Sequence, residues 1–171
     1  MIEIKRADLM DDRVIALLGR VTFDETFGSL FTYRDDLLTY LDQTFSVAKI
    51  TSSLSKLGNH YFVAECDGLP VGYAKIKCPS ASPFINGTGC QLQKIYVLKQ
   101  FHHAGIGRQL HDALIDHIAT QRYPHVWLSV LQSNTQAINF YKREDYQPVG
   151  EHQFTIGREV FDFNVYSKQL I

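Results

Sequence analysis

Apolar side chains recur along the chain at two spacings, and each spacing predicts one kind of element. From Ile106 to Ile118 they return every four positions, which is the period of one helix face. Similar stripes predict three helices that start near positions 12, 35 and 47, and a short helix within Asn134–Tyr141. Alternating or continuous apolar runs predict strands at residues 2–6, 61–65, 71–77, 92–97, 126–130, 146–155 and 159–170.

Polar residues and glycines indicate where these elements end. Ser46 is suited to cap the third helix and Gly58 to terminate it, as Gly28 is suited to terminate the first. Residues 67–70 (Asp-Gly-Leu-Pro) predict a hairpin loop. Residues 79–89 are rich in Pro, Ser and Gly, so they predict the longest loop of the chain, just before the central strand.

The connection between the strand at 92–97 and the helix after it carries the first sign of chemistry. Gly105 and Gly107 stand where that helix begins. A helix start offers unpaired N–H groups and the positive end of the helix dipole, so this connection predicts an anion site. Neither GxxxxGK[ST] nor GxGxxG is present, which excludes a P-loop and a dinucleotide-binding fingerprint.

Two motifs, taken together, resemble one family. His102-His103-Ala104-Gly105-Ile106-Gly107 is similar to the Gln/Arg-x-x-Gly-x-Gly/Ala motif of the GCN5-related N-acetyltransferases (GNAT), with His102 in place of Gln or Arg. Asn134, Ala137, Phe140 and Tyr141 match the closing motif of that family, whose Gly-Phe pair is replaced here by Asp145-Tyr146. The motifs come in the family's order and at its separation.

The resemblance implies a single GNAT domain over residues 1–171. The implied fold is α/β (α+β): a mixed, mostly antiparallel central sheet of about seven strands with helices on both faces. The implied cofactor is acetyl-CoA, bound in a splay between the fourth and fifth strands. By resemblance, the cofactor-binding residues are Ile95, Tyr96, Val97, His102, His103, Ala104, Gly105, Ile106, Gly107, Arg108 and Asn134. His103 could equally be a solvated loop residue.

The resemblance also assigns the chemistry of transfer. Tyr141 is the expected general acid that protonates the departing thiolate, although an aromatic beside Phe140 could equally be core. Asn134 is expected to hydrogen-bond the cofactor arm, and it could equally cap a helix. The general base stays open, because Gln91 stands where several relatives carry a glutamate. Deprotonation through ordered water, steered by Glu65 or a carboxylate of the early helices, is the remaining hypothesis.

The acceptor is predicted to be a primary amine of a small molecule. The expected acceptor wall carries Glu25 and Phe27, and Glu65 and Asp162 are further candidates. The segment from Thr22 to Gly28 and the following Leu-rich helix are similar to bacterial polyamine N-acetyltransferases, which suggests spermidine or spermine. A protein N-terminus or side chain is the alternative acceptor. A non-catalytic acyl-CoA sensor on the same fold is the alternative function.

Composition limits the choice of partners. The formal net charge of -1 argues against nucleic-acid binding. No apolar run reaches the ~18–20 residues that span a membrane, and no signal peptide is recognisable. Cys66, Cys78 and Cys90 fit neither a metal site nor a disulfide framework, so we expect reduced thiols, no metal and a cytoplasmic location. A homodimer through the aromatic last strand (Phe161, Phe163, Tyr166) is one reading, and a sheet core is the other.

Overall fold

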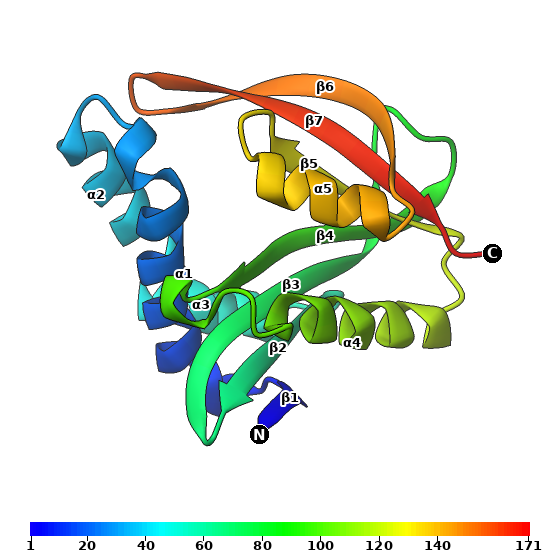
Figure 1. The fold of residues 1–171 in the computed structure, drawn as a ribbon, viewed down its shortest axis with the longest axis horizontal. Helices are drawn as coiled ribbons and strands as arrows, with labels where there is room; N and C mark the ends of the chain where they lie inside the picture. The colour runs from blue at the N-terminus through cyan, green and yellow to red at the C-terminus, as the bar shows by residue number, and fades with distance from the viewer.

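The seven strands form one sheet in the order β1-β2-β3-β4-β5-β7-β6. The computed structural model describes all residues, 1–171 (Figure 1). The strands are β1 (Ile2–Arg6), β2 (Asn59–Cys66), β3 (Leu69–Ala81), β4 (Thr88–Val97), β5 (His125–Leu131), β6 (Gln147–Ile156) and β7 (Glu159–Gln169). All neighbouring pairs are antiparallel except β4 and β5, which run parallel. The predicted mixed, mostly antiparallel sheet is therefore confirmed.

Helices cover both faces of this sheet, as predicted. They are α1 (Asp12–Phe27), α2 (Arg34–Thr44), α3 (Val47–Ser55), α4 (Ile106–Thr120) and α5 (Thr135–Arg143). One core cluster packs the apolar stripe of α4 and Tyr141 of α5 against the sheet. A second cluster packs α1, α2 and α3 against Tyr61, Val63 and Tyr73 on the opposite face. Figure 1 shows α4 and α5 in front of the sheet and α1–α3 gathered at one end.

Most predicted helix ends are found where the sequence placed them. The Ser46 side chain accepts from the Lys49 N–H at the start of α3, and α1 ends just before Gly28. The Asn134 side chain caps α5 by accepting from the Ala137 N–H. Gly58 does not terminate α3, because that helix already ends at Ser55; with φ +89° it turns the chain into β2 instead.

The predicted loop over residues 79–89 is wrong at both of its ends. β3 continues through Pro79 to Ala81, and β4 already begins at Thr88. Gly89 lies so close to β5 that a Cβ built there would come within 2.3 Å of the His125 carbonyl oxygen. The glycine that suggested a loop is therefore required by the close approach of two strands.

The cysteines also differ from the expectation of three reduced thiols. Cys78 of β3 and Cys90 of β4 form a disulfide with Cα atoms 4.6 Å apart, and Cys66 is free. The antiparallel pairing of β3 and β4 brings the two residues opposite each other, which their spacing along the chain does not reveal. No helix combines the length and apolar character needed to cross a membrane.

Candidate active site

The centre of the sheet opens where its two parallel strands separate. β4 and β5 pair only at Cys90–Val126 and Gln91–Trp127. Beyond Gln91 the edge of β4 that faces β5 has no strand partner. A β-bulge at Gln93 lies at the point of divergence, because Leu92 opposes Ile76 while Lys94 opposes Lys75.

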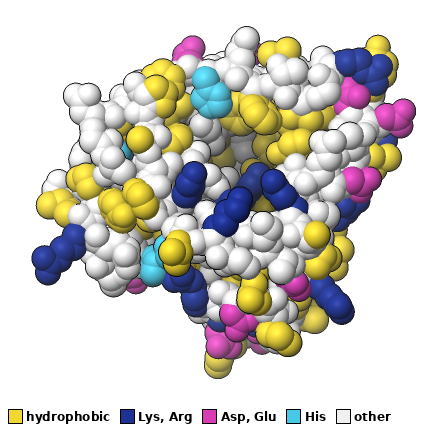
Figure 2. Space-filling model, turned by 180° about the vertical axis from the view of Figure 1, so that it is seen from behind, with side chains coloured by type: hydrophobic (Ala, Val, Ile, Leu, Met, Phe, Trp, Pro, Cys, Tyr) yellow, Lys and Arg dark blue, Asp and Glu magenta, His cyan; other side chains and the backbone are white.

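A cavity fills the gap between the splayed strands and draws its lining from both faces of the sheet. Ala137 and Tyr141 of α5 contribute from one face, and Phe27 of α1 and Phe163 of β7 from the other. The remaining lining residues are Leu92, Gln93, Lys94, Ile95, Tyr96, Ser129, Val130, Leu131 and Asn134. Figure 2 shows a hollow in the back of the molecule, lined by hydrophobic side chains, with Lys or Arg side chains along its lower rim.

The connection between β4 and α4 presents a row of free donors. None of the N–H groups of residues 103–108 donates a hydrogen bond, and the first N–H of α4 with a partner is that of Gln109. Gly105 has φ +78°, the left-handed conformation that glycine adopts without strain. A Cβ at Gly107 would meet no atom within 4 Å, so the space above it is open. The predicted anion site therefore has the expected geometry.

The His102 side chain points back toward β4 instead of out over this connection. Its Nε2 lies 2.8 Å from the Val97 carbonyl oxygen and donates to it, because a carbonyl can only accept. His103 has φ 68°, is exposed, and its ring lies 6.3 Å from that of His102. His102 thus fixes the shape of the turn that follows β4.

Tyr141 lies in the cavity with its hydroxyl unbonded to any protein group. The side chain is 7% exposed. Burial, with a smaller contribution from Tyr96, raises the pKa of this phenol above its ordinary value, so Tyr141 is neutral and holds its proton. The aromatic position that could have been plain core therefore also presents a donor to the cavity.

Asn134 combines the two roles that the sequence left open. Its side-chain oxygen caps α5 at 3.2 Å from the Ala137 N–H, and the same residue lines the cavity. Its amide nitrogen has no protein partner and can donate to a ligand. Arg108, at the start of α4, points to α5 and lies 3.8 Å from a Glu144 oxygen.

Of the four residues expected to contact the acceptor, only Phe27 lines the cavity. The Glu25 carboxylate accepts from the Lys99 N–H at 3.1 Å, at the exit of β4. Glu65 forms an ion pair with Lys5 at 2.7 Å, on the side of β3 away from β4. Asp162 alternates with Phe161 and Phe163, so it faces the other side of β7, where it accepts from Gln153.

The side chains of Gln91 and Gln93 meet on one side of β4. The Gln93 amide donates to the Gln91 oxygen at 3.0 Å, and Ser80 lies 3.4 Å from that oxygen. Neither glutamine can act as a base. The structure therefore leaves the strand position that carries a glutamate in some relatives without a titratable group.

A serine and a histidine that the sequence did not single out lie at the cavity instead. Ser129 of β5 lines it, and His152 Nε2 is 2.8 Å from the Ser129 hydroxyl. The His152 ring stacks on Phe163 at 5.3 Å. His152 Nδ1 lies 3.4 Å from the Gln153 carbonyl, which can only accept, so Nε2 is free to accept from Ser129. The pairing of β6 with β7 creates this arrangement, which a local motif cannot indicate.

Lys94 is the second lining residue that the sequence missed. Its side chain is partly buried, and burial lowers its pKa to about 8. The sequence marks Lys94 only as a lone lysine inside the apolar run Leu92–Val97. The side of β4 to which its side chain points depends on the bulge at Gln93.

One cluster outside the cavity has the composition of a metal site. Ligand atoms of His111, Asp112 and Glu144 lie within 4.8 Å of one another. His111 Nε2 already pairs with the Tyr146 hydroxyl at 2.9 Å, and burial lowers the pKa of this imidazole. Glu144 is engaged by Arg108. We assign no metal to this cluster.

These features define a class of protein. A narrow cavity lies between splayed parallel strands, where an extended arm can fit, and the free N–H groups of residues 103–108 can donate to a diphosphate. The free edge of β4 adds hydrogen-bonding groups along the arm. The residues present therefore fit an acyl-coenzyme A, and the fold and site define an acyl-CoA-dependent transferase.

Comparison with known proteins identifies the family. The profile of the Acetyltransferase (GNAT) family matches residues 23–146, and the chain belongs to this family. It is 26% identical over 158 residues to an uncharacterized N-acetyltransferase in the pepI 3′ region of Lactobacillus delbrueckii subsp. lactis, covering 92% of this chain and 89% of that protein.

Solved structures share the fold over nearly the whole chain. The PaiA N-acetyltransferase of Thermoplasma acidophilum, solved in complex with coenzyme A, superposes with a TM-score of 0.74 at 18% identity and 99% coverage of both chains. A GCN5-related N-acetyltransferase of Rhodopseudomonas palustris gives 0.76 at 17% identity, covering 98% of this chain and 95% of that chain. The protein is an acetyltransferase that uses acetyl-CoA.

Proposed function

We propose that this enzyme acetylates the primary amine of a small molecule, with Tyr141 as the general acid. Acetyl-CoA supplies the acetyl thioester and leaves as the thiol. The acceptor amine loses a proton and forms the C–N bond as the C–S bond breaks, and the sulfur takes up a proton. The observation that carries the proposal is the buried, neutral, unbonded hydroxyl of Tyr141 in the cavity between the splayed strands.

The chain's own groups suit the binding and orientation of the donor. The N–H groups of residues 103–108 are proposed to hold the diphosphate, with Arg108 adding charge beside them. The Ile95–Val97 backbone is proposed to pair with the arm, and an N–H there to polarise the acetyl carbonyl. His102 is proposed to have a structural role. Its contact with Val97 holds the turn between the Ile95–Val97 backbone and the N–H groups of residues 103–108.

We assign the Ser129–His152 pair as the group that accepts the proton lost by the acceptor amine. An ammonium group has an ordinary pKa of ~10.4, so it must lose a proton before it attacks. Ser129 can accept that proton at its hydroxyl while donating its own to His152 Nε2, 2.8 Å away. Histidine is the side chain suited to accept a proton near neutral pH. Glu65 does not support this role, because its carboxylate is paired with Lys5.

A polyamine acceptor finds no support in the site. The carboxylates expected to contact the acceptor have other partners: Glu25 accepts from the Lys99 N–H, Glu65 pairs with Lys5, and Asp162 accepts from Gln153. None of them lines the cavity. The proposal is therefore limited to a primary amine, and the next subsection argues its class.

The decisive test is Tyr141→Phe, assayed by release of the CoA thiol with saturating amine. We expect kcat to fall by about tenfold or more, since general acid catalysis contributes at least that much. The KM for acetyl-CoA should stay unchanged, because the phenyl ring still fills its place. Tyr123→Phe is the matched control, because that hydroxyl lies outside the cavity lining and forms no hydrogen bond. A Tyr141→Phe enzyme with full kcat would overturn the acid assignment.

A second test addresses the base. His152→Gln keeps a polar side chain near Ser129 but cannot accept the proton, so kcat at neutral pH should fall by about tenfold or more. Raising the pH should restore part of the loss, because more of the acceptor is then already neutral. A variant whose rate is reduced equally at every pH would show that His152 only supports Phe163.

A further inference from the structure

Two lysines oppose each other at the edge of the cavity. Lys75 of β3 and Lys94 of β4 are direct cross-strand partners. Like charges placed opposite each other in an antiparallel pair destabilise a sheet. The pair is nevertheless partly buried, with the Lys94 ammonium 5.4 Å above the Phe45 ring and the Lys75 ammonium 5.5 Å above the Tyr61 ring. The two aromatic rings and the sheet thus hold both ammonium groups on the same face of the sheet.

More lysines extend this positive surface away from the cavity. Lys77 follows on the same face of β3, and Lys49 and Lys56 lie on or directly after α3, near enough that their charges act on Lys75. We call these five residues (Lys49, Lys56, Lys75, Lys77 and Lys94) the lysine strip. The strip begins at Lys94, which lines the cavity together with Tyr141.

The lysine strip has no counter-charge. None of its five ammonium groups forms an ion pair within 4.0 Å, although five other basic side chains do so: Lys5, Arg20, Arg34, Arg108 and Arg158. The chain as a whole is nearly neutral, with 17 Lys and Arg against 18 Asp and Glu. Burial and mutual repulsion lower the pKa of Lys75 to about 8. An anion beside the pair would relieve this repulsion.

We infer that the acceptor carries an anionic group, a carboxylate or a phosphate, that binds between Lys94 and Lys75 while its amine faces Ser129 and Tyr141. This inference rests on the proposed function, since it names the class of amine that the site takes. The lysine strip also repels a polyamine. The site therefore discriminates against cationic amines as well as favouring anionic ones.

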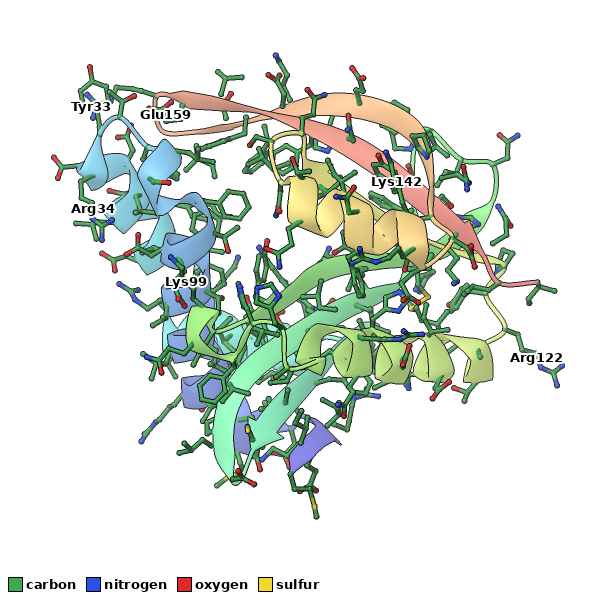
Figure 3. All side chains as sticks on the ribbon, viewed as in Figure 1. Tyr33, Arg34, Lys99, Arg122, Lys142 and Glu159 are labelled. Carbon is green, nitrogen blue, oxygen red and sulfur yellow. A yellow bond between two sulfur atoms is a disulfide. The ribbon has the colours of Figure 1, made fainter.

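The position of Lys94 supports a recognition role over a merely solvated one. A lysine that served only solubility would extend from an outer face into water, as Lys142 does on α5 (Figure 3). Lys94 instead lies inside the lining of the cavity, beside the bulge that directs it there. The Lys94 ammonium lies on the face of β4 opposite α4. It therefore remains available to the acceptor, the second substrate.

The test compares amines in pairs that differ only in the anion. Glycine is assayed against glycinamide, and phosphoethanolamine against ethanolamine, with spermidine as a cation and an acidic tetrapeptide as a peptide N-terminus. We expect kcat/KM for the anionic member of at least one pair to exceed that of its neutral partner by about tenfold or more, as charge-assisted hydrogen bonds predict. The pair with the larger difference in kcat/KM identifies whether the site recognises a carboxylate or a phosphate.

Variants then connect the preference to the strip. Lys94→Gln and Lys75→Gln should raise the KM for the anionic acceptor by about tenfold while changing that for its neutral partner little. Lys94→Arg should preserve the preference, because it keeps the charge; loss of kcat in this variant would instead make Lys94 the base. Arg122→Gln is the control, a cation at the far end of α4 (Figure 3). Calorimetry of the anionic amine binding to the CoA complex provides a readout independent of turnover.

The outcomes separate the inference from the proposed function. Turnover that favours spermidine or the neutral amines, or that ignores Lys94→Gln, overturns the anionic acceptor and leaves the acetyltransferase in place. Preference for the acidic peptide over both small pairs keeps the anionic group but moves the acceptor to a protein, which overturns the small-molecule part of the proposed function. Absence of turnover with every amine, together with absence of binding in calorimetry, counts against both.

Discussion

Gly105 and Gly107 lie two positions apart at the same helix start, yet they serve different needs. Gly105 is in the left-handed region, where a side chain costs roughly 1–2 kcal/mol. Gly107 has ordinary helical geometry, and nothing within the protein occupies the place of its missing Cβ. We therefore propose that the missing side chain of Gly107 leaves room for a ligand that approaches the backbone, while that of Gly105 serves the fold.

Alanine substitutions separate these two roles. Gly107→Ala should increase the free energy of unfolding by up to about 1 kcal/mol, the helix preference for alanine, while raising the KM for acetyl-CoA. Gly105→Ala should lower the free energy of unfolding by about 1 kcal/mol through backbone strain. Urea unfolding and steady-state kinetics measure both. A Gly107→Ala enzyme with an unchanged KM would show that the diphosphate does not approach this position.

At the scale of elements, the α1–α2 connection and the β6–β7 turn hold each other above the cavity. Asp36 of α2 accepts from the Arg158 backbone N–H at 2.9 Å and from its guanidinium, which lies 3.4 Å above the Tyr33 ring. Glu159 accepts from the Thr32 N–H at 2.6 Å. The Arg158 guanidinium lowers the pKa of Asp36, and the Thr32 bonds lower that of Glu159. Figure 3 shows Tyr33 and Glu159 meeting at this corner.

Breaking this contact should affect the acceptor more than the fold. The Asp36 side chain is 15% exposed, but its Arg158 partner is 57% exposed, so Asp36→Asn should lower the free energy of unfolding only slightly. The β6–β7 turn should become more mobile, which we expect to speed hydrogen exchange of its amides and to raise the KM for the amine a few-fold. Asp35→Asn is the neighbouring control, because Asp35 forms no ion pair or side-chain hydrogen bond. Equal hydrogen exchange in both variants would contradict this view.

Elements that depend on local sequence could be predicted, and features that depend on strand register could not. Ser46 and Asn134 cap their helices as expected, because a cap is read from neighbouring residues. The Cys78–Cys90 disulfide, the opposition of Lys75 and Lys94, and the Ser129–His152 contact each join two strands. A single bulge, at Gln93, decides which side of β4 carries Lys94, and no local pattern announces it.

The same distinction explains the outcome for the site. Tyr141, Asn134 and the 102–108 connection lie on contiguous motifs; the first two line the cavity, and the connection carries the free N–H groups. The acidic acceptor candidates rest on charge alone, and Glu25, Glu65 and Asp162 all have partners elsewhere. Of the aromatic residues of β7, Phe161 packs against Phe27 and Tyr166 is 3% exposed, as the reading of a sheet core expects.

The whole molecule keeps several histidines uncharged. Burial lowers the pKa of His111, His117 and His125 below the ordinary value, and burial with the charge of Arg6 lowers that of His60 to about 4. In the unfolded chain all four take up protons near pH 6.5. Acid therefore favours the unfolded chain over this range, before the paired carboxylates begin to titrate.

The free energy of unfolding should fall as the pH drops from about 6.5 to 4, the interval between the unfolded and native pKa of His60. Urea unfolding at several pH values measures it. His60→Gln retains a partner for Arg6 but takes up no proton, so its curve should fall less steeply. A wild-type protein that is equally stable at pH 7 and pH 5 would contradict this prediction.

β7 follows β6 along the chain, yet it lies inside the sheet. β7 is inserted between β5 and β6, and β6 touches the rest of the sheet only through it. On the ribosome, β1–β4 and their helices can assemble early, because each pairs with an element already made. β6 must wait without a partner until Gln169 has been added, and Phe163 reaches the cavity only then. A nascent chain stopped before β7 would therefore lack one wall of the cavity, so we expect activity only after β7 has been synthesised and inserted.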